Sequence, residues 1–348
     1  MKRTAAYLGA LTLAATAWTV GTAHAAPSSS GTTTSSGSVE RTTFSTAQQD
    51  KAIGFWTPER LRAAKDVSSL TPAQAAGTAA NTGSARAGSA ADPAGPEVSV
   101  PPAAAPASPT RTSSGAVSPL SSPTAWTGGG LIATTAGKVF FQNAAGGTYA
   151  CSATVANSDN KSVVLTAGHC VVDASTGEVY QNWVFIPGYA NGNRPYGTFA
   201  ARSLFHDGQY VSTGGNANWD YGFAAVGTVN GSTLVDTVGA QGIAFNSATG
   251  QHVHSFGYGG SDAEGNGERL NHCEGDEFAD AGRADSTMWG IDCVQTGGSS
   301  GGGFLASFDS SAGSGYLVGN ISVSSGSNEY HPVLGNSALS VYQQAGAA

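Results

Sequence analysis

The chain has 348 residues, a formal net charge of -8 at pH 7 and only 11% charged residues. That length allows a sizeable core and one or two domains, whereas the acidic balance provides no dense Lys/Arg face for a nucleic-acid backbone. Nucleic acid is therefore excluded from the expected partners. The 49 glycines and the scarcity of charge are typical of an exported β-protein that also carries a disordered segment.

The N-terminus predicts export. Lys2-Arg3 precede a small, apolar run from Ala5 to about Val20, and Ala23-His24-Ala25 has the A-x-A pattern of a signal-peptide cleavage site. We expect residues 1-25 to be a signal peptide and the protein to be secreted. The apolar run is short and diluted by Thr and Gly, which disfavours a membrane anchor, and no later stretch could span a bilayer.

Residues 26-125 are expected to form a pro-segment with a low-complexity linker. Positions 27-39 and 71-123 are rich in Ser, Thr, Gly, Ala and Pro and have little to bury, so they predict disorder and an extended linker. A passive spacer or cell-wall stalk is the alternative for such a composition.

A short helix is predicted near 57-65, inside this segment. Thr57 can cap it, Pro58 suits its first turn, and Trp56 can pack against Leu61. One or two short helices cannot form an independent core, so this island needs another surface on which to fold.

Beyond Trp126 the sequence predicts β-structure. Helical periodicity is confined to residues 337-344, and Gly, Asn, Asp and Ser separate short apolar or alternating runs. These runs lie at 138-141, 148-156, 161-166, 182-186, 221-226 and 316-323. The pattern indicates antiparallel sheets, as a sandwich or as two small barrels, in a domain that spans 126-348.

The four cysteines are expected to form disulfides, because an exported chain permits them. The even count of Cys151, Cys170, Cys273 and Cys293 allows three pairings. We expect Cys151 to pair with Cys170 and Cys273 with Cys293, since each pair closes one local loop.

His169 is the first candidate catalytic residue. The apolar run Ser162-Val163-Val164-Leu165 predicts a buried strand that carries Thr166 and His169 to its end, where Cys170 can fix the backbone. A lone histidine is more often structural, but one held in this way can act as a general base.

The Gly/Ser loop at 297-304 offers a nucleophile. Such a run is by default a flexible loop. A nucleophilic serine, however, needs a tight turn on which its own amide and that of a glycine two residues earlier converge on an oxyanion. Gly298 and Ser300 have this spacing, and Gly301-Gly302 would let a substrate approach closely.

Asp220 is the candidate acid, because it directly precedes the largely apolar strand predicted at 221-226. A carboxylate there can be buried and can orient a histidine through its Nδ1-H. A surface acid at the start of a strand is the alternative. Asp207 is the reserve, because the Gly-Gln that follows it makes a poorer buried strand.

Together these motifs resemble those of the chymotrypsin-like (trypsin-fold) serine endopeptidases. The resemblance rests on Thr166-Ala167-Gly168-His169-Cys170 with Cys151 upstream, on the Asp220 segment, and on Gly298-Ser299-Ser300-Gly301-Gly302, and it covers roughly residues 126-345. Asp292-Cys293 and the loop that follows look most like the secreted bacterial branch that includes the glutamyl endopeptidases. The resemblance implies an all-β fold of two antiparallel six-stranded β-barrels, preceded by the largely disordered pro-segment.

The resemblance also implies the role of each residue. His169 would be the general base, Asp220 its orienting acid and Ser300 the nucleophile, with the amides of Gly298 and Ser300 as the oxyanion hole. The implied protein is a secreted serine endopeptidase made as a zymogen. It is expected to be a monomer that acts on proteins or peptides, contacts its own pro-segment, and uses no cofactor and no metal. A catalytically inactive trypsin-fold binding or adhesion protein is the alternative.

Three positions depart from the family pattern. Ser299 stands where trypsin-like zymogens have an aspartate that pairs with the freed N-terminal amine, so that ion pair is not expected. Gly303 replaces a common proline. Ile321 stands where glutamate-specific members have a histidine, so a preference for glutamate is not implied.

Other motifs are weaker. Gly298-Ser299-Ser300-Gly301-Gly302 also fits the G-x-S-x-G of α/β-hydrolases, but too little chain follows for their acid and histidine. His252-Val253-His254 with His272-Cys273 suggests zinc, yet alternating histidines on an exported strand are more often surface or packing residues. Asp262-x-Glu264-x-Asn266-Gly267 resembles the start of a calcium loop, but Cys273 replaces the glutamate at its twelfth position.

Overall fold

The structure is a computed structural model that describes residues 1, 31-36, 38-69, 92, 95-104 and 120-348. Apart from Met1, the predicted signal peptide lies outside the described residues, as do positions 70-91 and 105-119 of the predicted linker. Gly31–Ala348 form one unit by their internal contacts, and the description below applies to it.

The first sheet closes into a six-stranded antiparallel barrel. Its strands pair in the order β10, β11, β8, β7, β6 and β9, and β9 pairs back with β10. Every residue of β8 and β11 is buried, as their apolar sequences predict. The bounds are β6 (Ala136–Gln142), β7 (Thr148–Ala156), β8 (Val163–Thr166), β9 (Gln181–Pro187), β10 (Phe199–Asp207) and β11 (Gly222–Val226). The predicted all-β class is confirmed.

Two further sheets form the second half. The larger has the order β4-β12-β18-β17-β13-β14-β5, in which only β12 and β18 pair in parallel, and the smaller has the order β15-β16-β20-β19. The bounds are β4 (Val98–Val100), β5 (Leu120–Ala125), β12 (Gly242–Phe245), β13 (His252–Gly257), β14 (Asn271–Asp276), β15 (Phe278–Ala279), β16 (Trp289–Ile291), β17 (Gly303–Asp309), β18 (Ser314–Asn320), β19 (Val323–Ser325) and β20 (Asn328–His331).

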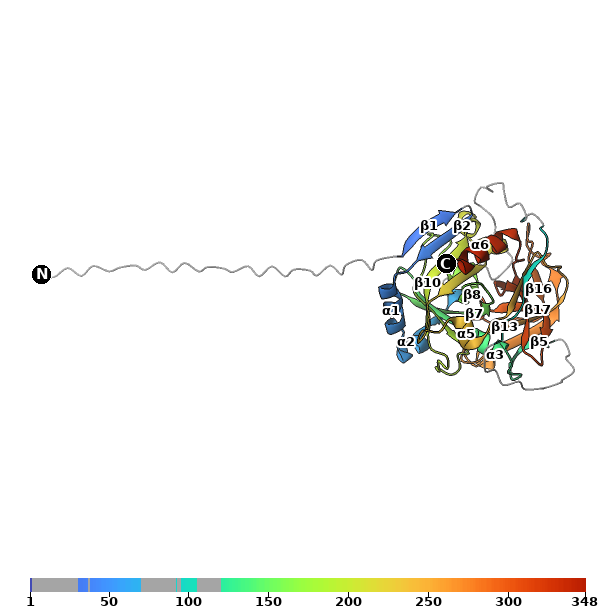
Figure 1. The fold of residues 1–348 in the computed structure, drawn as a ribbon, viewed down its shortest axis with the longest axis horizontal. Helices are drawn as coiled ribbons and strands as arrows, with labels where there is room; N and C mark the ends of the chain where they lie inside the picture. Colours follow the sequence, from blue (N-terminus) through green and yellow to red (C-terminus); the bar gives the residue numbers. More distant parts are fainter. Residues whose placement is uncertain (2–30, 37, 70–91, 93–94, 105–119) are drawn as a thin grey trace. The chain divides into compact units, whose positions relative to one another are not determined.

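The described residues between 31 and 69 of the predicted pro-segment pack on the first barrel. β1 (Thr32–Ser36) and β2 (Val39–Thr43) extend its sheet beside β10, and α1 (Thr46–Phe55) and α2 (Pro58–Ala63) follow them (Figure 1). Trp56, only 2% exposed, packs against Phe140, and its Nε1 donates to the carbonyl of Asn182 at 2.6 Å. The barrel therefore supplies the surface that these short helices need. After them come β3 (Lys65–Asp66) and the 3-10 turn η1 (Val67–Ser69).

Two parts of the predicted linker are strands. β4 pairs with β12 and β5 with β14, both antiparallel, although the composition of this tract predicts an extended linker. Each strand extends an edge of the larger sheet of the second half through main-chain hydrogen bonds. β4 also carries Val98 and Val100, and Val100 packs against the main core. The composition of the tract misses both strands, because they are short and the sheet edge that receives each one is not visible in the local sequence.

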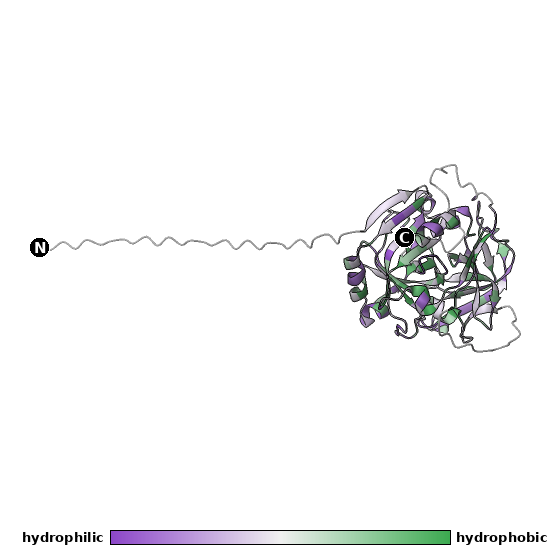
Figure 2. Ribbon diagram, in the orientation of Figure 1, coloured by the Kyte–Doolittle hydropathy of each residue, from purple (hydrophilic) through white to green (hydrophobic). Residues whose placement is uncertain are grey.

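The apolar residues concentrate on the strands, whereas α1 and α2 carry many hydrophilic residues (Figure 2). The C-terminal helix α6 (Asn336–Gly346) buries Val341 and Ala345 against the main core, as its periodicity predicts. The shorter helices and turns are α3 (Ile132–Thr135), η2 (Gly168–Cys170), α4 (Gly208–Ser212), η3 (Ala217–Trp219), α5 (Leu234–Val238) and η4 (Asp262–Glu264). No helix in the described ranges has both the length and the apolar character that a membrane crossing requires.

Candidate active site

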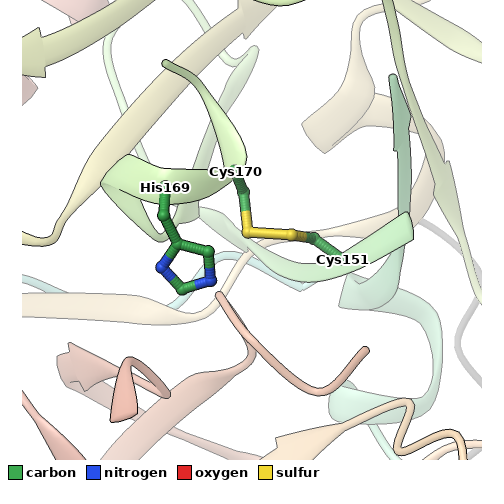
Figure 3. Close-up of side chains that lie close together, drawn as sticks. All are labelled: Cys151, His169 and Cys170. Atoms are coloured by element: carbon green, nitrogen blue, oxygen red, sulfur yellow. A yellow bond between two sulfur atoms is a disulfide. The ribbon is translucent and has the colours of Figure 1, made fainter. Parts of the chain in front are cut away.

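His169 lies in the turn η2, three residues after the end of strand β8, and is 7% exposed. Figure 3 shows its ring beside the disulfide that joins Cys151 to Cys170. The second disulfide joins Cys273 to Cys293. Although His169 and the first two cysteines lie close enough to suggest a metal site, the disulfide consumes both sulfurs and leaves no thiolate ligand. The disulfide instead fixes the turn that carries the histidine.

Asp220 holds His169 through two hydrogen bonds. The Asp220 Oδ2 lies 2.8 Å from the His169 Nδ1, and its Oδ1 accepts the His169 backbone amide at 2.8 Å. Burial alone would raise the pKa of Asp220, but His169 and the hydrogen bonds from His169 and Ser322 outweigh burial and lower that pKa. The carboxylate therefore stays ionised and favours the His169 tautomer that carries its proton on Nδ1. This tautomer leaves Nε2 free to accept a proton.

Ser322 is a site residue that the sequence analysis misses. It follows β18, and its Oγ donates to Asp220 Oδ2 at 2.5 Å. Nearby, Asn320 Nδ2 donates to the Asp220 carbonyl at 3.0 Å. The sequence carries no local signal for these contacts, because the two residues lie about a hundred positions from Asp220 and meet it only through the packing of the two halves.

Asp207, the reserve acid, makes different contacts. Its Oδ1 accepts the Gln209 amide at 2.9 Å and caps α4, and its Oδ2 accepts the Tyr221 hydroxyl at 3.1 Å. Burial raises the pKa of Asp207, in contrast to Asp220. The structure thus brings Asp220, and not Asp207, to the histidine.

The Ser300 loop is fixed to strand β7 by Ser152. The Ser152 amide donates to the Ser300 carbonyl at 2.7 Å, and its hydroxyl donates to the Gly298 carbonyl at 2.8 Å. The Ser300 carbonyl also lies 3.7 Å from the Sγ of Cys170, the neighbour of His169. The backbone of the candidate nucleophile is therefore anchored next to the histidine turn.

Gly301 lets the two segments touch. A Cβ at this position would lie 2.2 Å from Thr166 Oγ1 and 2.9 Å from the Ala167 nitrogen, and its φ of 85° also favours glycine. The Thr-Ala-Gly-His segment and the Gly-Ser-Ser-Gly-Gly loop thus pack directly against each other. A shared site for His169 and Ser300 requires this contact.

The amides of the loop divide into bonded and unbonded groups. Those of Ser299, Gly301 and Gly302 donate to the carbonyls of Thr296, Ile321 and Ser299. Within the described part of the chain, the amides of Gly298 and Ser300 donate to no protein acceptor. Ser299, which stands where an ion-pairing aspartate is common, turns its hydroxyl to the Thr296 carbonyl at 2.7 Å.

Two buried carboxylates hold the chain that leads into this loop. Glu329 Oε2 accepts the Gln295 amide at 2.9 Å, and Glu264 Oε1 accepts the Thr296 amide at 3.0 Å. The hydroxyls of Ser255 and Thr296 donate to Glu329 and Glu264, respectively. Glu264 belongs to the calcium-like motif of the sequence, but its side chain is 1% exposed and is used for these protein contacts.

The Glu329→Gln change is expected to remove one source of pH-dependent stability. Burial raises the pKa of Glu329 from 4.5 to about 7, with the Glu264 carboxylate adding to the shift. The stabilisation from protonated Glu329 is complete below about pH 4.5 and is lost as the pH rises through about 7, by about 3 kcal/mol. In urea unfolding, the wild type should lose about 3 kcal/mol more than the variant between about pH 5 and about pH 8.

Glu178→Gln is the control for Glu329→Gln, because Glu178 is the same residue type and is exposed. It should leave the pH dependence of the wild type unchanged. Equal pH dependence in the wild type and Glu329→Gln would show that this carboxyl does not keep its proton in the folded state.

Of three comparisons with known proteins, only the comparison with solved structures finds similar proteins, and those described here are proteases. No protein-family model and no curated protein matches the sequence. Among solved structures, the chain is similar to the protease Anisep from Arthrobacter nicotinovorans, with 37% identity over 65% of this chain and 100% of that chain and a TM-score of 0.60. It is also similar to AL20, a thermostable serine protease from an extremophilic microorganism, with 32% identity over 63% and 99% of the two chains and a TM-score of 0.57. A Glu endopeptidase, 17% identical over 65% of this chain and 97% of its own with a TM-score of 0.51, shares the fold.

Proposed function

Because this chain belongs to the chymotrypsin-fold bacterial serine proteases, we propose that it is a secreted serine endopeptidase that cleaves proteins or peptides. The observation that carries the proposal is the buried His169–Asp220 pair, with Nδ1 and Oδ2 2.8 Å apart, next to a loop that holds Ser300. The two disulfides fit an oxidising, extracellular environment.

The proposed reaction has two halves. The Ser300 Oγ attacks the peptide carbonyl and passes its proton to the His169 Nε2, while Asp220 stabilises the imidazolium. The amides of Gly298 and Ser300 donate to the developing oxyanion. The C-N bond then breaks, and the leaving amine takes the proton from His169. His169 then deprotonates a water molecule, which attacks the acyl-enzyme carbonyl. As the acyl group leaves, His169 returns the proton to the Ser300 Oγ.

The proposal is tested by labelling with phenylmethylsulfonyl fluoride. We expect the sulfonyl group on Ser300, together with loss of activity on casein, because only a serine beside a general base is nucleophilic enough to react. Ser300→Ala should be neither labelled nor active. Ser299→Ala is the matched control, since its hydroxyl is already bonded to the Thr296 carbonyl, and it should still be labelled. A folded wild type that takes no label would support the inactive binding protein instead.

We also propose that the segment up to about residue 70 is an inhibitory pro-segment. β3 pairs in parallel with Tyr149–Ala150, directly before Cys151. Asp66 Oδ1 lies 2.9 Å from where a Cβ on Gly298 would stand, and Ser68 Oγ lies 2.3 Å from the same point on Gly297. Val67, 1% exposed, is buried in the main core. These residues therefore lie against the loop that would have to receive a substrate.

A further inference from the structure

Two histidines and a glutamate, residue types that often bind metals, lie close together on β13 and β14, which are neighbouring strands in the larger sheet of the second half. The His254 Nδ1 lies 2.9 Å from the His272 Nε2 and 3.1 Å from the Glu274 Oε2, and the last two atoms are 3.5 Å apart. His254 and Glu274 are directly paired across the strands. The strand register therefore brings together three donor atoms from residues that the sequence places 18 and 20 positions apart.

Hydrogen bonding does not account for this arrangement. Glu274 is 1% exposed, and within the described residues neither of its carboxylate oxygens has a hydrogen-bond partner. One proton between the two histidine nitrogens can satisfy their contact, but it leaves the carboxylate without a donor. A buried carboxylate without a partner is costly, so the cluster as it stands lacks a positive charge.

A bound metal ion would supply that charge. Ligands about 2.0-2.2 Å from a tetrahedral Zn²⁺ lie about 3.3-3.6 Å from one another. The 3.5 Å separation of His272 and Glu274 fits this range, and the other two separations, 3.1 and 2.9 Å, are shorter and would have to widen slightly on binding. His254 and His272 are both buried and turn ring nitrogens towards the Glu274 carboxylate, and a neutral imidazole nitrogen is a common metal ligand. Two imidazoles and one carboxylate suit Zn²⁺ and not Ca²⁺ or Mg²⁺, which prefer oxygen ligands.

The surroundings close the site on one side and leave it open on the other. The Phe308 ring packs on the His254 ring, with 4.7 Å between their centroids, and the Trp126 ring packs on the His272 ring, with 5.1 Å between theirs. His252, two residues before His254, has a side chain that is 44% exposed, and ligand atoms of His252, His254 and Glu274 lie within 4.8 Å of one another. The His252 Nδ1 is paired with the Asp276 Oδ1 at 2.8 Å, so its Nε2, or a water on that side, would be the fourth ligand.

We propose that His254, His272 and Glu274 bind one Zn²⁺ ion, which joins β13 to β14 at a site separate from the His169–Asp220 pair. The sequence alone favours surface or packing roles for these histidines, because it does not show that Glu274 lies beside them. An ion that binds the folded chain and not the unfolded chain stabilises the fold by mass action. The proposal does not depend on peptidase activity, and its test does not use that activity.

The test uses the full chain, stripped with a chelator and then titrated with ZnCl₂ by calorimetry and thermal unfolding. We expect one Zn²⁺ per chain and a higher Tm. Glu274→Gln, of nearly equal size, should bind Zn²⁺ about 100-fold more weakly or worse. Glu277→Gln is the matched control, because Glu277 is also a buried glutamate paired with one histidine, His331, at 2.9 Å. It should bind Zn²⁺ as tightly as the wild type.

The wild type also provides a test that does not depend on how the variants fold. Co²⁺ bound to the stripped wild type should give the visible absorption of a tetrahedral site, and Zn²⁺ should displace it. A wild type that takes up no stoichiometric Zn²⁺, or a folded Glu274→Gln that binds Zn²⁺ as the wild type does, overturns the proposal.

Discussion

Asp220→Asn is expected to lower kcat on a peptide substrate by about 10,000-fold while the chain stays folded. The carboxylate accepts from both the Nδ1 and the backbone amide of His169, and an amide nitrogen in its place would turn a donor towards the ring. His169 would then present Nδ1 as the acceptor and carry its proton on Nε2, where it could not accept the proton of Ser300. The measurement is steady-state kcat and KM, with circular dichroism to monitor folding.

Asp207→Asn is the matched control for that experiment. Asp207 is also a buried aspartate, but it bonds Gln209 and Tyr221 and not His169. We expect its kcat to stay within a few-fold of the wild type. If Asp220→Asn kept more than a tenth of wild-type kcat, Asp220 would not be the residue that orients the base.

Trp56→Ala is expected to lower the free energy of unfolding of the full chain by about 3-5 kcal/mol. Trp56 is 2% exposed, its ring centroid lies 5.4 Å from that of Phe140, and its indole nitrogen donates to the Asn182 carbonyl. Truncation would leave a cavity and an unbonded carbonyl. Urea unfolding measures the loss, and Ile53→Ala, at a position 38% exposed in α1, should lose far less.

The same variant tests the inhibitory role of the pro-segment. Trp56 fastens the helices that precede Asp66 and Ser68, so loosening it should raise the peptidase activity of the uncleaved chain above that of the wild type. A Trp56→Ala chain that is destabilised but no more active would show that these residues do not obstruct the substrate.

The regular parts of the fold are predictable because they depend on local pattern. The buried strands β7, β8 and β11 follow from short, largely apolar runs, and the helix α6 follows from apolar residues with a period of 3.6. β4 and β5 are not predictable in this way, because β4 has only three residues, β5 is poor in apolar residues, and the partner strands hold both by backbone pairing. The predicted run at 316-323 divides, since Ile321 turns its amide to the Gly302 carbonyl.

The candidate active site and the proposed zinc site also contain residues that local sequence predicts and residues that it does not. His169 and the Ser300 loop carry motifs that chemistry alone can interpret, and the choice of Asp220 over Asp207 depends on the strand that follows each. Ser322, Glu329 and Glu274 have no such motif. Each acts through a partner that is distant in the sequence, so its role depends on a packing that only the folded chain defines.

If the proposed pro-segment is removed by cleavage, the strands β4 and β5 restrict where the chain can be cut. β4 and β5 belong to the second sheet, and Asp92 Oδ2 accepts the amide of Ser337 at 2.7 Å, in the first turn of α6. A maturation cut that spares these contacts has to fall before residue 92, so the mature N-terminus would lie well upstream of residue 126. Departure of the leader would also strip β2 from β10 and leave residues 203-207 of that strand with an open backbone edge. The freed leader, or another extended segment, could then pair with that open edge.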